Sequence, residues 1–216
     1  MKLSHAAQDY LKEIYKLQTA TGRATTTALA ERLGVAPPSV SAMLKKLAAL
    51  GLAEHERYRG AVLTVRGRAI AIEMIRHHRL LEQYLSKTLG MGIDELHAEA
   101  DRLEHALSEE LEARIDESLG FPTHDPHGDP IPDARLRLER QDVRPVTELL
   151  VGERSVVVRV PDGDPQLLRY LAELGLVPDA ELELAESAPF GGPLTLRVGG
   201  SERAISRELG ARIGVR

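Results

Sequence analysis

The sequence contains no cysteine and no tryptophan, and aromatic residues make up 3% of its 216 positions. Without cysteine the chain has no disulfide, no thiol nucleophile and no thiolate metal ligand. No apolar run approaches the roughly 20 residues of a membrane span, and the first ten residues lack the apolar core of a secretory signal. We therefore expect a cytoplasmic protein that makes no membrane contact.

Charge is distributed unevenly along the chain. Residues 1–70 contain 11 Lys and Arg against 5 Asp and Glu, residues 71–145 contain 9 against 17, and residues 146–216 contain 8 against 11. A basic end on an acidic body is typical of a protein that binds a polyanion at that end. The length predicts two domains or three small ones, and the ordinary hydrophobic content of 43% excludes disorder of the whole chain.

Residues 1–70 show the pattern of a winged helix-turn-helix domain. Apolar residues at helical spacing predict a helix over 4–20, a short helix over 28–33 with Thr27 as its N-cap, and a helix over 38–50. The short turn between the last two is that of a helix-turn-helix. Two strands over 52–56 and 61–64, around a turn at 58–60, predict the wing.

Residues 71–145 are predicted to be helical and to mediate dimerisation. One helix is expected over 65–89 and a second over 94–119, and the apolar stripe of the first is broad enough to pack against a second copy of the chain. Residues 122–132 contain four prolines and predict a solvated polar loop, with a metal site at His124, Asp125, His127 and Asp129 as the alternative.

Residues 146–216 are predicted to form a small β-barrel. Short strand patterns cover 156–160, 180–184, 194–198 and 204–205, and one helix covers 166–174. The predicted fold class is therefore mainly α, with an N-terminal winged helix-turn-helix domain, a helical dimerisation domain and a small C-terminal barrel.

Residues of the metal-ligand type cluster on the predicted helices. On a helix over 94–119, His97, Asp101, Glu104 and His105 would share an arc of about 100°. The pair His78 and Glu82 shares a helix face four residues apart, and carboxylates and imidazoles at such spacing bind divalent transition metals. The alternative is a solvated, salt-bridged helix face, and His5 and His77 are expected to be plain surface residues.

Several segments match a known protein family and together cover residues 3–134 almost without gaps. These segments are Asp9–Tyr15, Ala30–Leu33, Pro38–Ser41, Tyr58–Gly60, His78–Glu82, Glu104–His105 and Asp129–Pro132. On these segments the chain resembles the diphtheria toxin repressor and manganese transport regulator family of metal-dependent bacterial transcription factors, and residues 146–216 look like the SH3-like barrel of the longer members.

The resemblance implies two metal sites. The primary site would comprise Asp9, Asp101, Glu104 and His105, the ancillary site His78, Glu82 and His97, and the barrel would add Asp164 and Gln166. Iron-type members have Met and Cys where this chain has Asp9 and Asp101, and hard oxygen ligands favour Mn²⁺, with Fe²⁺ as the alternative. Manganese-type members have a further acid where this chain has Lys12.

The family also implies a homodimer on double-stranded operator DNA. The helix over 38–50 would enter the major groove and place the side chains at its N-terminal end against base edges. We expect base contacts from Pro38, Ser39 and Ser41, and phosphate contacts from Thr27, Lys45, Lys46, Arg57 and Arg59.

Two other functions fit parts of the sequence. A helical carboxylate–histidine metalloenzyme is one, although the chain lacks a Gly-rich phosphate loop and a serine elbow. A metal-independent winged-helix regulator that senses an organic ligand is the other, although few aromatic residues are present to build such a pocket. We expect no enzyme activity and no organic cofactor.

Overall fold

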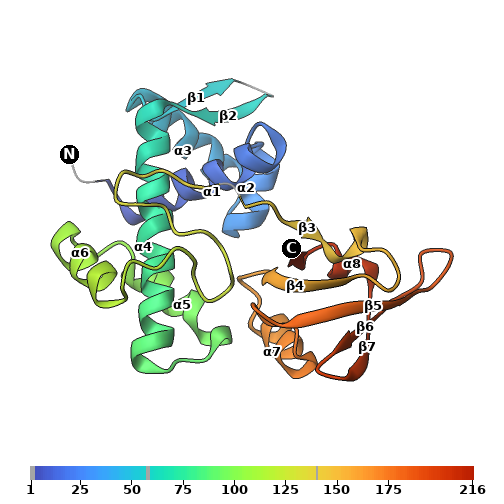
Figure 1. Ribbon diagram of the computed structural model, residues 1–216. Coiled ribbons are helices and arrows are strands. Elements are labelled where there is room, and N and C mark those ends of the chain that lie inside the picture. The colour runs from blue at the N-terminus through green and yellow to red at the C-terminus, as the bar shows by residue number, and fades with distance from the viewer. Residues whose placement is uncertain (1–2, 57–58, 140) are drawn as a thin grey trace. The chain divides into compact units, whose positions relative to one another are not determined.

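The structure is a computed structural model that describes residues 3–56, 59–139 and 141–216 (Figure 1). The chain divides into two compact units. The first comprises Met1–His78, Glu104–Leu107 and Pro132–Leu138, and the second comprises Arg79–Leu103, Ser108–Ile131 and Glu139–Arg216. None of the described helices is both long enough and apolar enough to cross a membrane.

Three helices form the N-terminal part of the first unit: α1 (His5–Thr21), α2 (Thr26–Leu33) and α3 (Pro37–Ala49). The N-cap of α2 is Thr25, whose side-chain oxygen accepts the N–H of Ala28, so the prediction that Thr27 caps this helix was wrong. Ala24 forms a β-bridge with Ala61, the backbone is extended at Thr25, and the helix begins at Thr26, two residues earlier than predicted.

A two-stranded hairpin follows the three helices and confirms the predicted strand pair. Strand β1 (Ala53–Glu56) pairs in antiparallel register with β2 (Gly60–Leu63). Gly60 has φ +80°, and a Cβ atom there would lie 2.3 Å from the backbone oxygen of Ala24, so only glycine fits where the hairpin meets the helices. Arg57, a predicted phosphate contact, lies outside the described residues.

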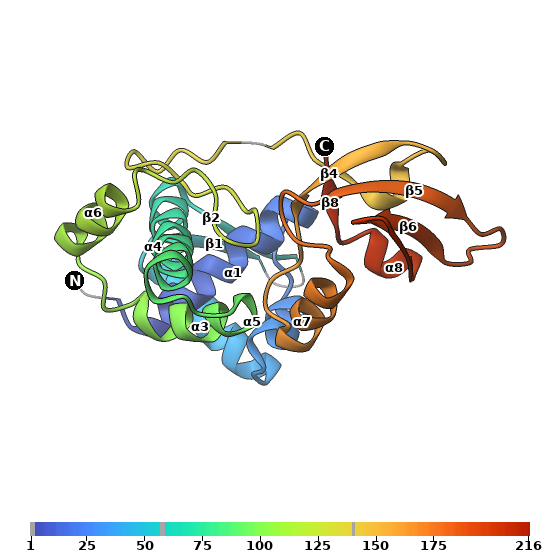
Figure 2. The ribbon, with the colours of Figure 1, turned by 60° about the horizontal axis from the view of Figure 1, so that its bottom comes forward.

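The core of the first unit is apolar and continuous. Side chains of α1, α3 and β1 pack with the start of the long helix α4 (Val65–Leu89), whose bounds match the prediction. Figure 2 looks nearly along α4, with α1 passing beside it. The fully buried members include Leu11, Ile14, Leu44, Leu47 and Ala71.

The single helix predicted over 94–119 is in fact two helices. Helix α5 (Ile93–Leu103) ends before Glu104, and α6 (Glu109–Ser118) begins after Ser108, whose side chain accepts the N–H of Leu111 as an N-cap. Glu104 and His105 therefore lie in the turn between two helices, and the predicted arc of four ligand-type side chains on one helix was wrong.

The second unit contains an open antiparallel sheet. Its strands are β3 (Arg144–Pro145), β4 (Arg154–Arg159), β5 (Glu181–Ser187), β6 (Leu194–Val198), β7 (Ser201–Ile205) and β8 (Gly214–Val215), in the order β3-β8-β4-β5-β6-β7. The predicted barrel is not closed, because β3 pairs with β8 over only two residues and no described strand joins β3 to β7. The helical elements η1 (Val146–Glu148), α7 (Pro165–Leu174) and α8 (Arg207–Gly210) lie in the same part of the chain as the sheet, and Figure 2 labels α7 and α8.

Candidate metal centre

The first candidate site joins helix α1 to the turn between α5 and α6. Asp9, Glu104 and His105 each offer one ligand atom, and these three atoms lie within 4.8 Å of one another. Nε2 of His105 lies 3.0 Å from Oδ1 of Asp9 and 3.8 Å from Oε1 of Glu104. All three residues belong to the first unit, and two carboxylates with an imidazole form a donor set for a divalent transition metal.

Glu104 is the buried centre of this group, with a side chain that is 1% exposed. Its Oε1 accepts a hydrogen bond from Nζ of Lys12 at 2.6 Å, and its Oε2 lies 2.6 Å from Nδ1 of His78. Burial would raise the pKa of the Glu104 carboxyl, but the hydrogen bond with His78 and the charge of Lys12 hold it below its ordinary value. Glu104 is therefore ionised at neutral pH.

Two histidines that we expected to be plain surface residues contact this site. The exposed ring of His5 stacks on His105 with ring centroids 4.5 Å apart and planes 12° apart. His77 is buried, and its Nδ1 lies 3.2 Å from the backbone oxygen of Glu104. The helical spacing of His5 and Asp9 on α1 was a signal for the first contact, whereas the second depends on where the α5–α6 turn packs.

A second candidate site lies in the second unit, where the sequence analysis favoured a solvated loop. Glu82 of α4 and Asp125 and His127 of the proline-rich segment are all buried, and one ligand atom of each lies within 4.8 Å of the others. His127 is fully buried, and neither of its ring nitrogens makes a hydrogen bond within the described residues. The interpretation of this segment as solvated was wrong for Asp125 and His127, which are buried beside α4, whereas His124 is exposed.

Charge interactions with α4 hold the proline-rich segment in place. Oδ1 of Asp125 accepts the backbone N–H groups of His127 and Asp129, each at 2.9 Å. Arg79 of α4 lies 3.5 Å from Oδ2 of Asp125 and 3.4 Å from Asp129, and it donates to the backbone oxygen of Pro130 at 2.6 Å. The arginine therefore balances part of the acidic charge gathered here.

The electrostatics of the second site are those of a buried acidic cluster. Burial, Asp129 and Glu82 raise the pKa of Asp125 to about 7. Burial would lower the pKa of the His127 imidazole, but the neighbouring acids Glu82, Asp125 and Asp162 outweigh it and raise that pKa to about 9. A cation is therefore favoured at this position, whether it is a proton on His127 or a metal ion.

The other residues predicted to bind metal lie outside these two groups and make different contacts. Nδ1 of His97 lies 3.5 Å from Glu82, and its Nε2 lies 3.6 Å from the carboxylate of Asp101 one turn further along α5. Asp164 is the N-cap of α7, and its Oδ1 accepts the N–H groups of Gln166 and Leu167. Gln166 itself is exposed on the first turn of α7.

The predicted DNA-contacting side chains of α3 lie near the surface. Pro38, Ser39, Lys45 and Lys46 are exposed, and the hydroxyl of Ser41 donates to the backbone oxygen of Pro37 at 3.1 Å. Arg59, at the hairpin, is 74% exposed beside Glu56. Thr27 is exposed on α2.

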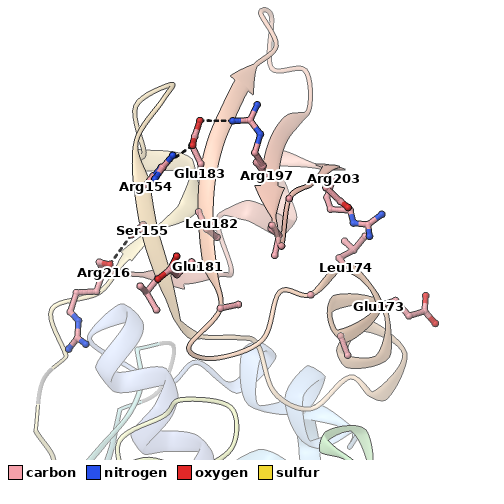
Figure 3. Close-up of a pocket in the computed structure, with 18 residues that line it drawn as sticks. Arg154, Ser155, Glu173, Leu174, Glu181, Leu182, Glu183, Arg197, Arg203 and Arg216 are labelled. Carbon is pink, nitrogen blue, oxygen red and sulfur yellow. Dashed lines mark hydrogen bonds and ion pairs between the residues drawn. The ribbon is translucent and has the colours of Figure 1, made fainter.

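A cavity of about 970 Å³ lies against the C-terminal sheet (Figure 3). Arg154 and Arg197 face Glu183 across its wall, at 3.1 Å and 2.9 Å. No member of either candidate metal site is among the described residues that line it, so we do not count it as part of the metal centre.

Comparison with known families gives three consecutive matches. Residues 2–61 match the iron dependent repressor N-terminal DNA binding domain, residues 64–133 match the iron dependent repressor metal binding and dimerisation domain, and residues 144–216 match the FeoA domain. Together with the helix-turn-helix, the hairpin and the ligand clusters, these matches define a metal-responsive DNA-binding regulator.

Proteins with similar sequences belong to the same class of regulator. The iron-dependent repressor IdeR of Mycobacterium tuberculosis is 36% identical over 220 residues, which cover 93% of this chain and 92% of that protein. The diphtheria toxin repressor of Corynebacterium efficiens is 38% identical over 123 residues, or 57% of this chain and 54% of that protein. The chain belongs to the family of the diphtheria toxin repressor and the manganese transport regulator, whose members found here are transcriptional repressors rather than enzymes.

Solved structures show the same relationship over nearly the whole chain. A manganese-dependent transcriptional repressor in complex with manganese is 40% identical with a TM-score of 0.87, and the match covers 97% of this chain and 98% of that one. ScaR with bound Zn²⁺ is 32% identical with a TM-score of 0.82, over 97% of this chain and 98% of that one.

Proposed function

We propose that this chain is a Mn²⁺-activated repressor that binds operator DNA as a homodimer. Its proposed parts are a winged helix-turn-helix over 1–70, a metal-binding and dimerisation part over 71–145 and an SH3-like part over 146–216. The observation that carries the proposal is the Asp9–Glu104–His105 group, because it joins α1, from the DNA-binding match, to the turn at 104–107, from the dimerisation match.

The donor atoms of both sites fit a divalent metal ion. Each group combines two carboxylates with one imidazole, and neither contains sulfur, which favours Mn²⁺ by ligand type although raw affinity follows the Irving–Williams order. At the second site, neither ring nitrogen of the buried His127 makes a hydrogen bond within the described residues, so a nitrogen is available to bind a metal ion. Fe²⁺ is the alternative ion, and we expect no organic cofactor.

The protein's own side chains explain how metal concentration would control orientation. A bound divalent cation supplies the positive charge that two facing carboxylates need. Asp9 is fixed to α1 and thereby to the helices that read DNA, whereas Glu104 and His105 are fixed to the turn that follows α5. Ligation from both sides favours one orientation of α1 relative to that turn, and DNA that selects the same orientation must tighten metal binding by the same factor.

Helix α3 is the proposed recognition helix, which would enter the major groove of DNA. Its N-terminal residues Pro38, Ser39 and Ser41 would meet base edges, while Lys45 and Lys46 would contact phosphates. Short hydroxyl side chains give little bidentate recognition of bases, so we expect thymine methyl contacts and DNA shape to supply much of the specificity. Arg59 would contact the backbone from the hairpin.

The test begins by selecting bound duplexes from a random-sequence DNA pool with the full chain and Mn²⁺. Affinity for the selected duplex is then measured in EDTA and across titrations of Mn²⁺ and of Fe²⁺ under anaerobic conditions. We expect Mn²⁺ to raise DNA affinity and the Glu104→Gln variant to lose that increase. The exposed Glu186→Gln change is the matched control and is expected to keep it.

Three outcomes would contradict parts of the proposal. Equal DNA affinity in EDTA and in Mn²⁺ would favour a metal-independent regulator. Stronger activation by Fe²⁺ than by Mn²⁺ at equal free concentration would assign iron. A Glu104→Gln variant that responds to Mn²⁺ like the wild type would remove this group from the regulatory site.

A further inference from the structure

The first two turns of α1 place three side chains around His105. His5, Gln8 and Asp9 are spaced i, i+3 and i+4, so they share one face of the helix. Nε2 of His105 lies 3.0 Å from Oδ1 of Asp9, and its Nδ1 lies 3.1 Å from Oε1 of Gln8. The ring of His5 stacks on one face of the imidazole. The orientation of His105 is therefore fixed at both nitrogens and on one ring face.

The two nitrogens of a neutral imidazole have different roles, since one carries a hydrogen and the other a lone pair. A metal-bound histidine usually donates its other N–H to an oxygen, and this second contact fixes the tautomer. At His105 the carboxylates of Asp9 and Glu104 lie on the Nε2 side. The oxygen on the Nδ1 side is the side-chain amide of Gln8.

We propose that Gln8 and His5 are positioning residues for the Asp9–Glu104–His105 site. With a metal ion bound, Gln8 would accept the Nδ1–H of His105, which leaves the lone pair of Nε2 for the ion that Asp9 and Glu104 also hold. His5 covers the ring face and limits rotation of the imidazole. This inference rests on the proposed metal-binding function of the site.

The chemical type of each residue suits its role. The amide oxygen of Gln8 is a neutral acceptor, so it orients His105 without adding a third negative charge beside Asp9 and Glu104. His5 supplies a flat ring from the exposed start of α1, where a smaller side chain would leave that face of His105 open to water. Helix α1 therefore contributes two orienting contacts as well as the carboxylate of Asp9.

Within the described residues, the second site lacks such an arrangement. Nδ1 of His127 lies 3.6 Å from Oε2 of Glu82, which is itself a member of that site, and Nε2 of His127 makes no hydrogen bond within the described residues. The arrangement of an amide acceptor and a stacked ring around the imidazole is therefore seen at the site that contains α1.

The test for Gln8 uses full-length protein labelled with ¹⁵N at histidine and titrated with Zn²⁺, a diamagnetic probe of divalent metal binding. The nitrogen signals of His105 report both which nitrogen binds the metal and the affinity of this site alone. We expect Nε2 to bind Zn²⁺ in the wild type. We expect Gln8→Leu to weaken binding at His105 by about 10- to 100-fold, and Gln8→Glu, which keeps an acceptor, to retain it.

The matched control is Gln18→Leu on the same helix. Oε1 of Gln18 accepts the backbone N–H of Leu63 and does not contact His105, so this change is expected to alter stability but not Zn²⁺ affinity at His105. For His5, exchange of the His105 Nδ1–H with water is measured in the Zn²⁺-loaded protein. His5→Ala is expected to accelerate this exchange at least several-fold, and His5→Phe, which keeps a stacked ring, to restore it.

The possible results distinguish a failure of the positioning roles from a failure of the metal site itself. Wild-type affinity and an unchanged His105 spectrum in Gln8→Leu would overturn the role of Gln8 and leave the metal site intact. Equal exchange rates in His5→Ala and the wild type would overturn the role of His5. Wild-type His105 signals that do not respond to Zn²⁺ would overturn the metal site and the positioning roles together.

Discussion

In the metal-free protein, we expect replacement of either member of the buried Lys12–Glu104 pair to be at least as destabilising as replacement of both. Nζ of Lys12 lies 2.6 Å from Oε1 of Glu104, and the two side chains are 7% and 1% exposed. Removal of one partner takes this close ion pair away from the other buried charge, which costs about 3–5 kcal/mol. His78 still contacts Glu104 when Lys12 is absent, so we expect Lys12→Met to lie near the lower end of that range.

The strength of the Lys12–Glu104 interaction is best measured as a coupling energy between the two substitutions. If the two positions were independent, Lys12→Met and Glu104→Gln together would cost about 6 kcal/mol, the sum of two changes at the lower end of that range. Because the double variant removes both charges of the pair, we expect it to cost no more than either single change, at most about 3 kcal/mol. The resulting coupling of at least about 3 kcal/mol is at the upper end for residues in direct contact.

The assay is urea unfolding in EDTA at pH 7, followed by far-UV circular dichroism, on the wild type and the three variants. The exposed Glu110–Arg114 pair serves as a matched cycle, for which we expect almost no coupling. The folded pKa of Glu104 lies below its ordinary value of 4.5, so the stabilisation is present above pH 4.5 and is lost as the pH falls through the lower folded value. If the losses of unfolding free energy in the two single variants add up to the loss in the double variant within about 0.5 kcal/mol, the two residues are not coupled and the reasoning is refuted.

Three further changes test other parts of the molecule. Lys46→Ala is expected to weaken DNA binding for all sequences and to flatten the plot of log affinity against log salt by about one unit; an unchanged slope in fluorescence anisotropy would exclude a phosphate contact. The raised pKa of Asp125 means that its stabilisation is complete below its ordinary value of 3.8 and is lost as the pH rises through about 7. Asp125→Asn should therefore raise the melting temperature of the metal-free protein more at pH 8.5 than at pH 5.5, and an equal shift at both would contradict this. Gly128→Ala places a Cβ atom 1.8 Å from the backbone oxygen of Val158 at φ +88°, so it should lower the melting temperature. Gly90→Ala, with φ +68° but no atom within 4 Å of the new Cβ, should lower the melting temperature less. Equal losses in the two variants would assign the effect to backbone strain alone.

Much of the fold follows from local patterns in the sequence. The apolar spacing of α4 predicted its bounds because a long amphipathic helix depends on few distant contacts. The break after Leu103 was missed because ligand-type residues continue the helical spacing beyond it. Ser108 was the available signal, since it begins a new helix as an N-cap.

The two candidate sites differed in how far the sequence revealed them. Asp9, Glu104 and His105 were identified through a resemblance that matches them position by position. A metal site at His127 was only the alternative to a solvated loop, because the burial of His127 beside Glu82, 45 positions earlier in the sequence, is not a local signal. A loop rich in proline and acidic residues is usually solvated, and only the packing of α4 shows that this one is not.

Each candidate site already contains a positive charge from the protein itself. Lys12 balances Glu104 at the first site, and Arg79 balances Asp125 at the second. A zinc-finger domain needs its metal to fold, because its ligands have no other source of stability. Here the acidic ligands are paired and the first unit has an apolar core of its own, so we expect the protein to fold without the ion. Metal binding can then change the orientation of α1 relative to the α5–α6 turn, and with it the DNA affinity, without unfolding the protein. A sensor of changing metal concentration requires this property.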